Sequence, residues 1–225
     1  MMNLIKCHFA YLLNKVTLFI LPSVNIIMII SLITNIGDEY SDNFNSYYFS
    51  SIVMIKICFC FISIFLFSIS IYKQNDYYAY YILTSNVSRI KYITSKIILI
   101  TGTVLINFVF LFIIFLLIGF LLQDYFYYQI IFLYGFIETC LIVVIYGLYG
   151  MLLMQITQNL FTIIFPFVFM ILTSDLGDSL IETLLMMIFP NTRDVDIINL
   201  IHLIWLTCLL IVSNIIIFCK KDLHY

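Results

Sequence analysis

Long apolar segments dominate this 225-residue chain and constrain its fold more than any other feature. A helix needs about 20 apolar residues to cross the hydrocarbon core of a bilayer. Hydrophobic residues make up 64% of the sequence and charged residues only 10%, whereas an average globular domain carries roughly 25% charged residues. A soluble domain of this size has too much surface to hide so many apolar side chains. The sequence therefore predicts an all-α membrane protein that forms one domain over residues 1–225.

Six segments have the apolar character of transmembrane helices. We place them at residues 16–36, 51–71, 97–122, 130–154, 160–173 and 197–219. The fifth is short and is interrupted by Pro166, so we expect it either to begin nearer Gln155 or to be a bent helix that continues into the next loop. An even number of spans places both termini on the same side of the membrane.

The basic residues predict which side that is, because they remain on the cytoplasmic side. One side carries Lys6, Lys15, Lys73, Arg89, Lys91, Lys96, Lys220 and Lys221. The other side carries Arg193 and most of the acidic residues, namely Asp38, Glu39, Asp42, Asp124, Asp175, Asp178, Glu182, Asp194 and Asp196. We therefore expect both termini and the loop at residues 73–96 to be cytoplasmic. The formal net charge of −2 gives no indication of a nucleic-acid partner.

Two regions outside the spans have helical patterns. Residues 1–15 are predicted to form an amphipathic helix that lies flat at the cytoplasmic interface, although a plain positively charged leader to the first span also fits. In the outer loop at residues 174–196, apolar side chains recur at helical spacing up to Pro190. A helix that dips into the outer leaflet and a helix on the surface both fit that pattern.

Sequence signatures of catalysis and cofactor binding are lacking. The chain has no G-x-x-x-x-G-K-[ST] phosphate loop, so it cannot bind ATP by that route. No histidine is spaced to share a metal with another ligand. The six cysteines lie in or beside the spans and in the N-terminal helix, where we expect packing thiols and no disulfides. We therefore expect this chain to hold no metal or cofactor.

Two charged residues, Lys56 and Glu138, lie within the predicted spans. Charge inside a membrane is costly, which makes each a candidate for a functional role on a translocation path. For Glu138, an ion pair with Lys56, a protonated carboxyl bonded to a neighbouring helix and a role in lining the path all remain open. For Lys56 we favour an ammonium group that extends to the outer headgroups.

The loop at residues 73–96 carries a motif typical of one transporter family. It reads Leu83-Thr84-Ser85-Asn86-Val87-Ser88-Arg89, followed by Tyr92 and by Lys96 at the start of the third predicted span. Together with the six spans, the N-terminal helix and the helical outer loop, this motif makes the chain resemble the permease subunit of type-2 ABC exporters. The resemblance is to small Gram-positive peptide-export and immunity permeases, such as phenol-soluble modulin exporters.

The resemblance implies a role for the loop. In that family the loop forms a coupling helix that docks in a groove of a separate ATPase subunit. The corresponding residues here are Tyr77, Tyr78, Tyr81, Ile82, Leu83, Thr84, Ser85 and Ser88, with Arg89, Lys91 and Lys96 fixing the exit of the loop at the membrane surface. Without the family, the same basic residues indicate only an ordinary cytoplasmic anchor.

The resemblance also implies partners and a location. ATP and Mg would bind to the ATPase subunits, so this chain would not itself be an enzyme. A second permease copy or a homologous permease would complete the path, and the substrate would be an amphipathic or hydrophobic peptide, such as a cytolytic toxin or an antimicrobial peptide. The expected location is the cell membrane of a Gram-positive bacterium. Two alternatives are a substrate-capture subunit of a vitamin or metal importer and, less favoured, an intramembrane enzyme.

Overall fold

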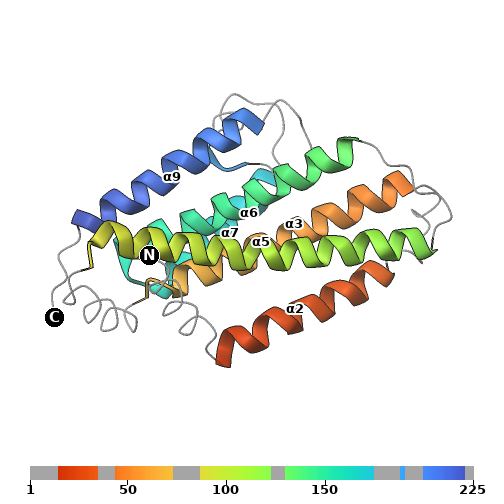
Figure 1. Ribbon diagram of the computed structural model, residues 1–225, viewed down its shortest axis with the longest axis horizontal. Coiled ribbons are helices and arrows are strands. Elements are labelled where there is room, and N and C mark those ends of the chain that lie inside the picture. The colour runs from red at the N-terminus through yellow and green to blue at the C-terminus, as the bar shows by residue number, and fades with distance from the viewer. Residues whose placement is uncertain are drawn as a thin grey trace.

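Every regular element that the structure describes is a helix (Figure 1). The computed structural model describes residues 15–34, 44–72, 87–122, 130–174, 188–190 and 200–220. The helices are α2 (Lys15–Thr34), α3 (Phe44–Ile69), α5 (Arg89–Leu122), α6 (Ile130–Thr157), the short 3₁₀ helix η3 (Leu160–Ile163), α7 (Ile164–Ser174) and α9 (Leu200–Lys220). The all-α prediction is confirmed for this part of the chain. Residues 1–14, and with them nearly all of the expected interfacial helix, lie outside it.

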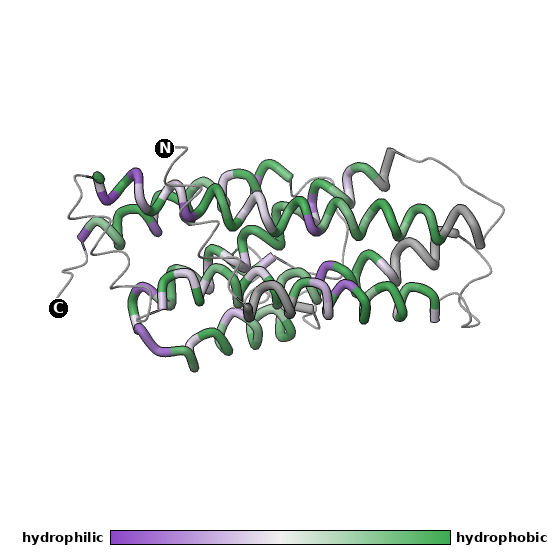
Figure 2. Tube along the Cα trace, turned by 60° about the horizontal axis from the view of Figure 1, so that its bottom comes forward, coloured by the Kyte–Doolittle hydropathy of each residue, from purple (hydrophilic) through white to green (hydrophobic). Residues whose placement is uncertain are grey.

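Four of these helices are long and apolar enough to cross a membrane. They cover Ser51–Ile69, Arg89–Ile118, Leu133–Thr157 and Leu200–Lys220, and two shorter apolar helices cover Leu21–Thr34 and Leu160–Leu172. Figure 2 shows how little of their length is hydrophilic. The length and apolar character of these helices are therefore compatible with a protein embedded in a membrane. The count of six spans and the side of the termini stay predictions.

The third predicted span begins earlier than the sequence suggested. We expected it to start after a loop ending at Lys96, but α5 already begins at Arg89, eight residues before Ile97. At about 1.5 Å per residue, its 34 residues extend well beyond a hydrocarbon core of about 30 Å. The basic residues that looked like loop therefore form the first turns of a helix.

The described helices share one basic end. Helices α2 and α5 begin there, and α3, α6 and α9 end there, as the colours in Figure 1 show. Of the Lys and Arg positions in the described helices, all but Lys56 belong to this end, that is Lys15, Arg89, Lys91, Lys96 and Lys220. The described helices thus gather their basic residues at one end, while the acidic residues expected at the opposite end lie outside the described part of the chain.

Helices α3 and α6 form the centre of the bundle, where two glycines allow close approach. A Cβ atom added at Gly147 would overlap Ser63 Oγ and lie 2.5 Å from Phe67 Cδ2. One added at Gly150 would lie 2.7 Å from Ser68 Oγ and 3.0 Å from the carbonyl oxygen of Ile64. Both helices run in the same direction, so these contacts also fix their register.

The fifth predicted span is interrupted at a different place from the one expected. Helix α6 ends at Thr157, and Gln158 adopts a left-handed conformation with φ of 53°. Asn159 then starts η3, because its side chain accepts a hydrogen bond from the Phe161 N–H. Pro166 lies in the first turn of α7, where a missing N–H is tolerated. The interruption between α6 and α7 thus begins at Gln158 and Asn159, before η3, and not at the proline.

Candidate functional site

Two cations of the loop motif donate hydrogen bonds to the ends of other helices. Lys96 Nζ lies 2.6 Å from the carbonyl oxygen of Ser70, just past the end of α3, and Arg89 Nη1 lies 2.9 Å from the carbonyl oxygen of Cys219 in the last turn of α9. The last carbonyls of a helix have no partner within it and carry partial negative charge. Each cation therefore satisfies and neutralises a helix C-terminus.

An aromatic stack lies between these two contacts. Lys96 Nζ lies 4.7 Å from the centroid of the Tyr92 ring, within the range of a cation–π interaction. The Tyr92 ring in turn stacks on Phe218 of α9, with centroids 5.5 Å apart and planes 18° from parallel. Tyr92 and Phe218 are both buried.

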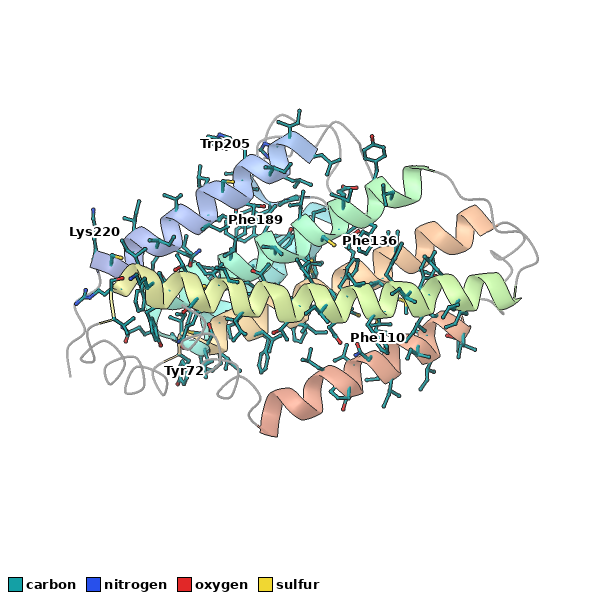
Figure 3. All side chains as sticks on the ribbon, viewed as in Figure 1. Tyr72, Phe110, Phe136, Phe189, Trp205 and Lys220 are labelled. Carbon is teal, nitrogen blue, oxygen red and sulfur yellow. The ribbon has the colours of Figure 1, made fainter. Side chains whose placement is uncertain are left out.

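We call this cluster the basic junction and define it as Ser70, Arg89, Tyr92, Lys96, Phe218 and Cys219. It joins the end of α3, the start of α5 and the end of α9, and Figure 3 shows Tyr72 and Lys220 near it at the basic end. The chain between Tyr72 and Val87 leaves and re-enters the described structure beside it. Whatever that stretch contacts, its two ends are fixed to three helices.

The remaining motif residues divide into two groups. Ser88 starts α5, since its Oγ accepts a hydrogen bond from the Lys91 N–H at 3.4 Å, and both Ser88 and Lys91 are exposed. The predicted docking residues Tyr77, Tyr78, Tyr81, Ile82, Leu83, Thr84 and Ser85 lie outside the described residues. Their contact with an ATPase stays a prediction.

The role expected for Lys96 changes. We placed it at the exit of the loop on the membrane surface, but it is only 5% exposed and lies two turns inside α5. Its long stem follows the helix and its ammonium group ends on the Ser70 carbonyl oxygen. Hydropathy counts a lysine as solvent-facing and cannot detect a partner on another helix.

Lys56 is fully buried, with 0% of its surface exposed, so the expectation that it reaches the outer headgroups is wrong. It lies seven residues before Ser63, which contacts Gly147, and therefore on the side of α3 that faces α6. Its ammonium group is directed into the bundle for this reason.

Glu138 is also buried, at 4% exposed. The register fixed by Gly147 and Ser63 brings it level with Lys56. It lies nine residues before Gly147, however, which is half a turn away from the side of α6 that faces α3. The ion pair with Lys56, the bond to a neighbouring helix and the role on a translocation path all stay predictions for Glu138.

A second cluster, which the sequence did not indicate, lies on α6. Tyr146 Oη donates to the carbonyl oxygen of Pro190 at 3.0 Å, and Tyr149 Oη donates to that of Ile188 at 2.6 Å. Phe189 packs between the Tyr149 ring, 4.9 Å away, and the Phe169 ring of α7, 4.3 Å away and nearly parallel to it. We call the two tyrosines and residues 188–190 the tyrosine clamp.

The clamp shows what residues 188–190 of the outer loop contact. Tyr146 lies 11 residues before the end of α6, which is about 16 Å from the basic end. Phe169 precedes the end of α7 by five residues, and its ring stacks on that of Phe189. Figure 3 places Phe189 near the middle of the bundle. The helix expected before these residues lies outside the described part of the chain, so a dip into the membrane and a position on its surface both stay predictions.

Two other polar contacts join helices within the apolar region. The Asn214 amide on α9 donates to the carbonyl oxygen of Leu148 at 3.2 Å and its oxygen accepts from Gln155 Nε2 at 3.3 Å. Asn25 of α2 and Asn107 of α5 form a reciprocal pair, at 2.8 and 3.3 Å. Such residues hold helices together where lipid offers no hydrogen bond. Isolated Asn and Gln within apolar segments were the signal that could have identified them.

The described residues contain no group of three or more potential metal ligands. No family model and no curated protein matches this sequence. The arrangement of the basic junction therefore carries the functional argument by itself.

Proposed function

We propose that this chain is the membrane-spanning subunit of an ATP-driven exporter whose ATPase is a separate protein. In this proposal the chain crosses the cell membrane of a Gram-positive bacterium six times, with both termini and the basic end in the cytoplasm. Positive residues gathered at one end of the apolar helices support that orientation.

The basic junction is the observation that carries the proposal. A loop that receives force from an ATPase must pass it to the membrane helices, which requires ends that do not slide independently. Lys96 fixes the start of α5 to the end of α3, and Arg89 fixes it to the end of α9. The loop of residues 73–86 is thereby attached to three helices at once.

The substrate proposal follows from the character of the exposed helix faces. Apolar side chains such as Ile106 on α5, Phe165 on α7 and Trp205 on α9 are exposed, and they suit lipid, a second permease and an amphipathic peptide that enters from the bilayer. We propose that two copies, or this chain and a homologous one, form the path for such a peptide between them.

Co-purification with a candidate ATPase subunit in nanodiscs tests the proposal. The ATPase is chosen by its G-x-x-x-x-G-K-[ST] phosphate loop. We expect the intact chain to retain the ATPase and the double variant Tyr81→Ala/Leu83→Ala to lose it. Lys91→Ala is the matched control, because this exposed residue is close to the loop and makes no side-chain hydrogen bond to another described residue.

Failure of the intact chain to bind any such ATPase would remove the basis of the proposal. Tight binding of a vitamin or a metal ion by the purified chain alone would instead support the substrate-capture alternative. A loss of ATPase binding in Lys91→Ala equal to that in the double variant would show that the contact is merely electrostatic.

A further inference from the structure

The contact between Arg89 and Cys219 has a consequence beyond the attachment of the loop. Helix α9 is distant in sequence from residues 73–86, yet its last turn is held by the first residue of α5. Phe218, next to Cys219, stacks on Tyr92 one turn further along α5. A hydrogen bond and a ring stack thus join the same two turns.

The two contacts restrain different motions. The bond from Arg89 opposes sliding of α9 along its axis, because it ends on a backbone carbonyl oxygen. The ring stack opposes rotation of α9, because turning would move Phe218 off the Tyr92 face. Lys96 holds that face in turn, since its ammonium group lies over the same ring.

One turn before its contact with Tyr92, α9 is also fixed to the central helix α6. Asn214 lies one turn from Phe218 and donates to the carbonyl oxygen of Leu148 on α6. That carbonyl lies between Tyr146 and Tyr149, the two residues of the tyrosine clamp. A continuous set of contacts therefore runs from Arg89 through the last turns of α9 to the middle of α6.

We infer that Arg89 is a positioning residue that makes α9 move together with the start of α5, so that displacement of the loop reaches the tyrosine clamp through α9. This inference rests on the proposed function. It assigns Arg89 to the interior of the permease and not to the surface that the ATPase contacts.

A covalent replacement of the contact tests the inference. Arg89→Cys removes the guanidinium group and places a thiol within reach of the native Cys219, which is partly exposed. The background carries Cys7→Ser and Cys208→Ser, so that these two thiols do not react. A short bifunctional thiol reagent then joins position 89 to Cys219.

We expect Arg89→Cys to bind the ATPase normally and to transport substrate about tenfold less per ATP hydrolysed, because a charge-assisted hydrogen bond no longer links the two helices. The tether should restore most of that loss. The same reagent on the background protein with Arg89 intact is the control, and Lys91→Cys gives a matched thiol on an exposed side of α5.

Two results overturn the inference: normal coupling in the untethered Arg89→Cys protein, and no recovery after complete tethering. Arg89→Lys provides a second variant where Arg89→Cys fails to fold, and it should retain intermediate coupling because lysine can donate one bond to the carbonyl oxygen. Absence of ATPase binding in the intact chain would be a failure of the proposed function and is measured separately.

Discussion

The basic junction and the tyrosine clamp both satisfy backbone carbonyl oxygens, but they do so at different depths in the bundle. Each supplies hydrogen-bond donors to backbone carbonyl oxygens of another part of the chain. At the basic end the donors are the charged groups of Arg89 and Lys96, and in the middle of the bundle they are the neutral hydroxyls of Tyr146 and Tyr149. We attribute this difference in donor type to the free-energy cost of burying a charged group.

A charged donor makes a stronger hydrogen bond than a neutral one but loses more hydration on burial. At the junction Arg89 is partly exposed, whereas Lys96 is buried and is compensated by the Ser70 carbonyl oxygen and the Tyr92 ring. Inside the bundle, the carbonyl oxygens of Ile188 and Pro190 must be satisfied by protein groups, and a hydroxyl does this without charge. We therefore expect depth to favour the neutral donor at the clamp, although Lys56 shows that the bundle also holds a buried charge.

Replacing a neutral donor of the clamp by a charged one should have the largest effect on stability. Tyr146→Lys places an ammonium group at a fully buried position in the middle of α6, where insertion of a lysine costs about 2.5–3.5 kcal/mol. Loss of the ring adds to that cost, so we expect little folded protein. The amount recovered and the thermal unfolding in detergent measure the effect.

Arg89→Lys is the matched exchange at the junction, where a charged donor is retained. We expect it to lower the free energy of unfolding by less than about 1 kcal/mol. Equal stability of the two variants would show that depth does not govern the choice of donor.

Removal of the charged donor at the junction should have the next largest effect. Lys96→Met keeps the volume of the stem but leaves the Ser70 carbonyl without its donor and the Tyr92 ring without its cation. We expect a loss of about 2 kcal/mol in the free energy of unfolding, measured by titration with a denaturing detergent.

Lys91→Met removes the same charge from an exposed position on the same helix and should change stability by less than about 0.5 kcal/mol. A similar loss in both variants would argue that overall charge, and not the contact with Ser70, sets the stability of this end.

Hydropathy located the described helices well, because a membrane span must be both long and apolar. It placed the start of the third span at Ile97 because it counted Arg89, Lys91 and Lys96 as solvent-facing. Two of these three donate to carbonyls of other helices, which is a property of the tertiary structure. The burial of Lys56 was missed for the same reason, since its side of α3 became known only with the contacts of Gly147.

The tyrosine clamp was harder to foresee than the junction. Tyrosines are expected at membrane interfaces, and the aromatic-rich loops of this chain fit that expectation. Tyr146 and Tyr149 lie well inside an apolar segment, where a buried hydroxyl needs an acceptor. Their position was a signal, but the identity of the acceptor, 39 to 44 residues away in sequence, was not readable.

Deletion of one hydroxyl from the clamp should have a moderate effect. Tyr146→Phe retains the ring and loses the bond to Pro190, for which we expect about 1 kcal/mol in the free energy of unfolding. Tyr134→Phe, near the other end of α6, is the control and should be neutral.

A thiol introduced by Ile188→Cys, in a background without Cys208, reports the release of the segment. It should react faster with a maleimide once Tyr146→Phe is present, because Ile188 is already half exposed and then loses part of its anchoring. An unchanged labelling rate together with unchanged stability would mean that packing of Phe189 alone holds the segment.

Mutation of the Asn25–Asn107 pair should have the smallest effect on stability, and it adds a third kind of donor to the comparison. Each side chain supplies both donor and acceptor, so the pair satisfies itself and requires neither charge nor a free carbonyl. A double-mutant cycle with Asn25→Leu and Asn107→Leu should give a coupling energy of about 0.6 kcal/mol. Each single variant should be less stable than the double variant, because it leaves one amide without its partner. A coupling energy as large as the loss in Lys96→Met would mean that reciprocal amides hold α2 as firmly as a charged donor holds α5. The effect of depth on the choice between charged and neutral donors would then apply only to donors that bind backbone carbonyls.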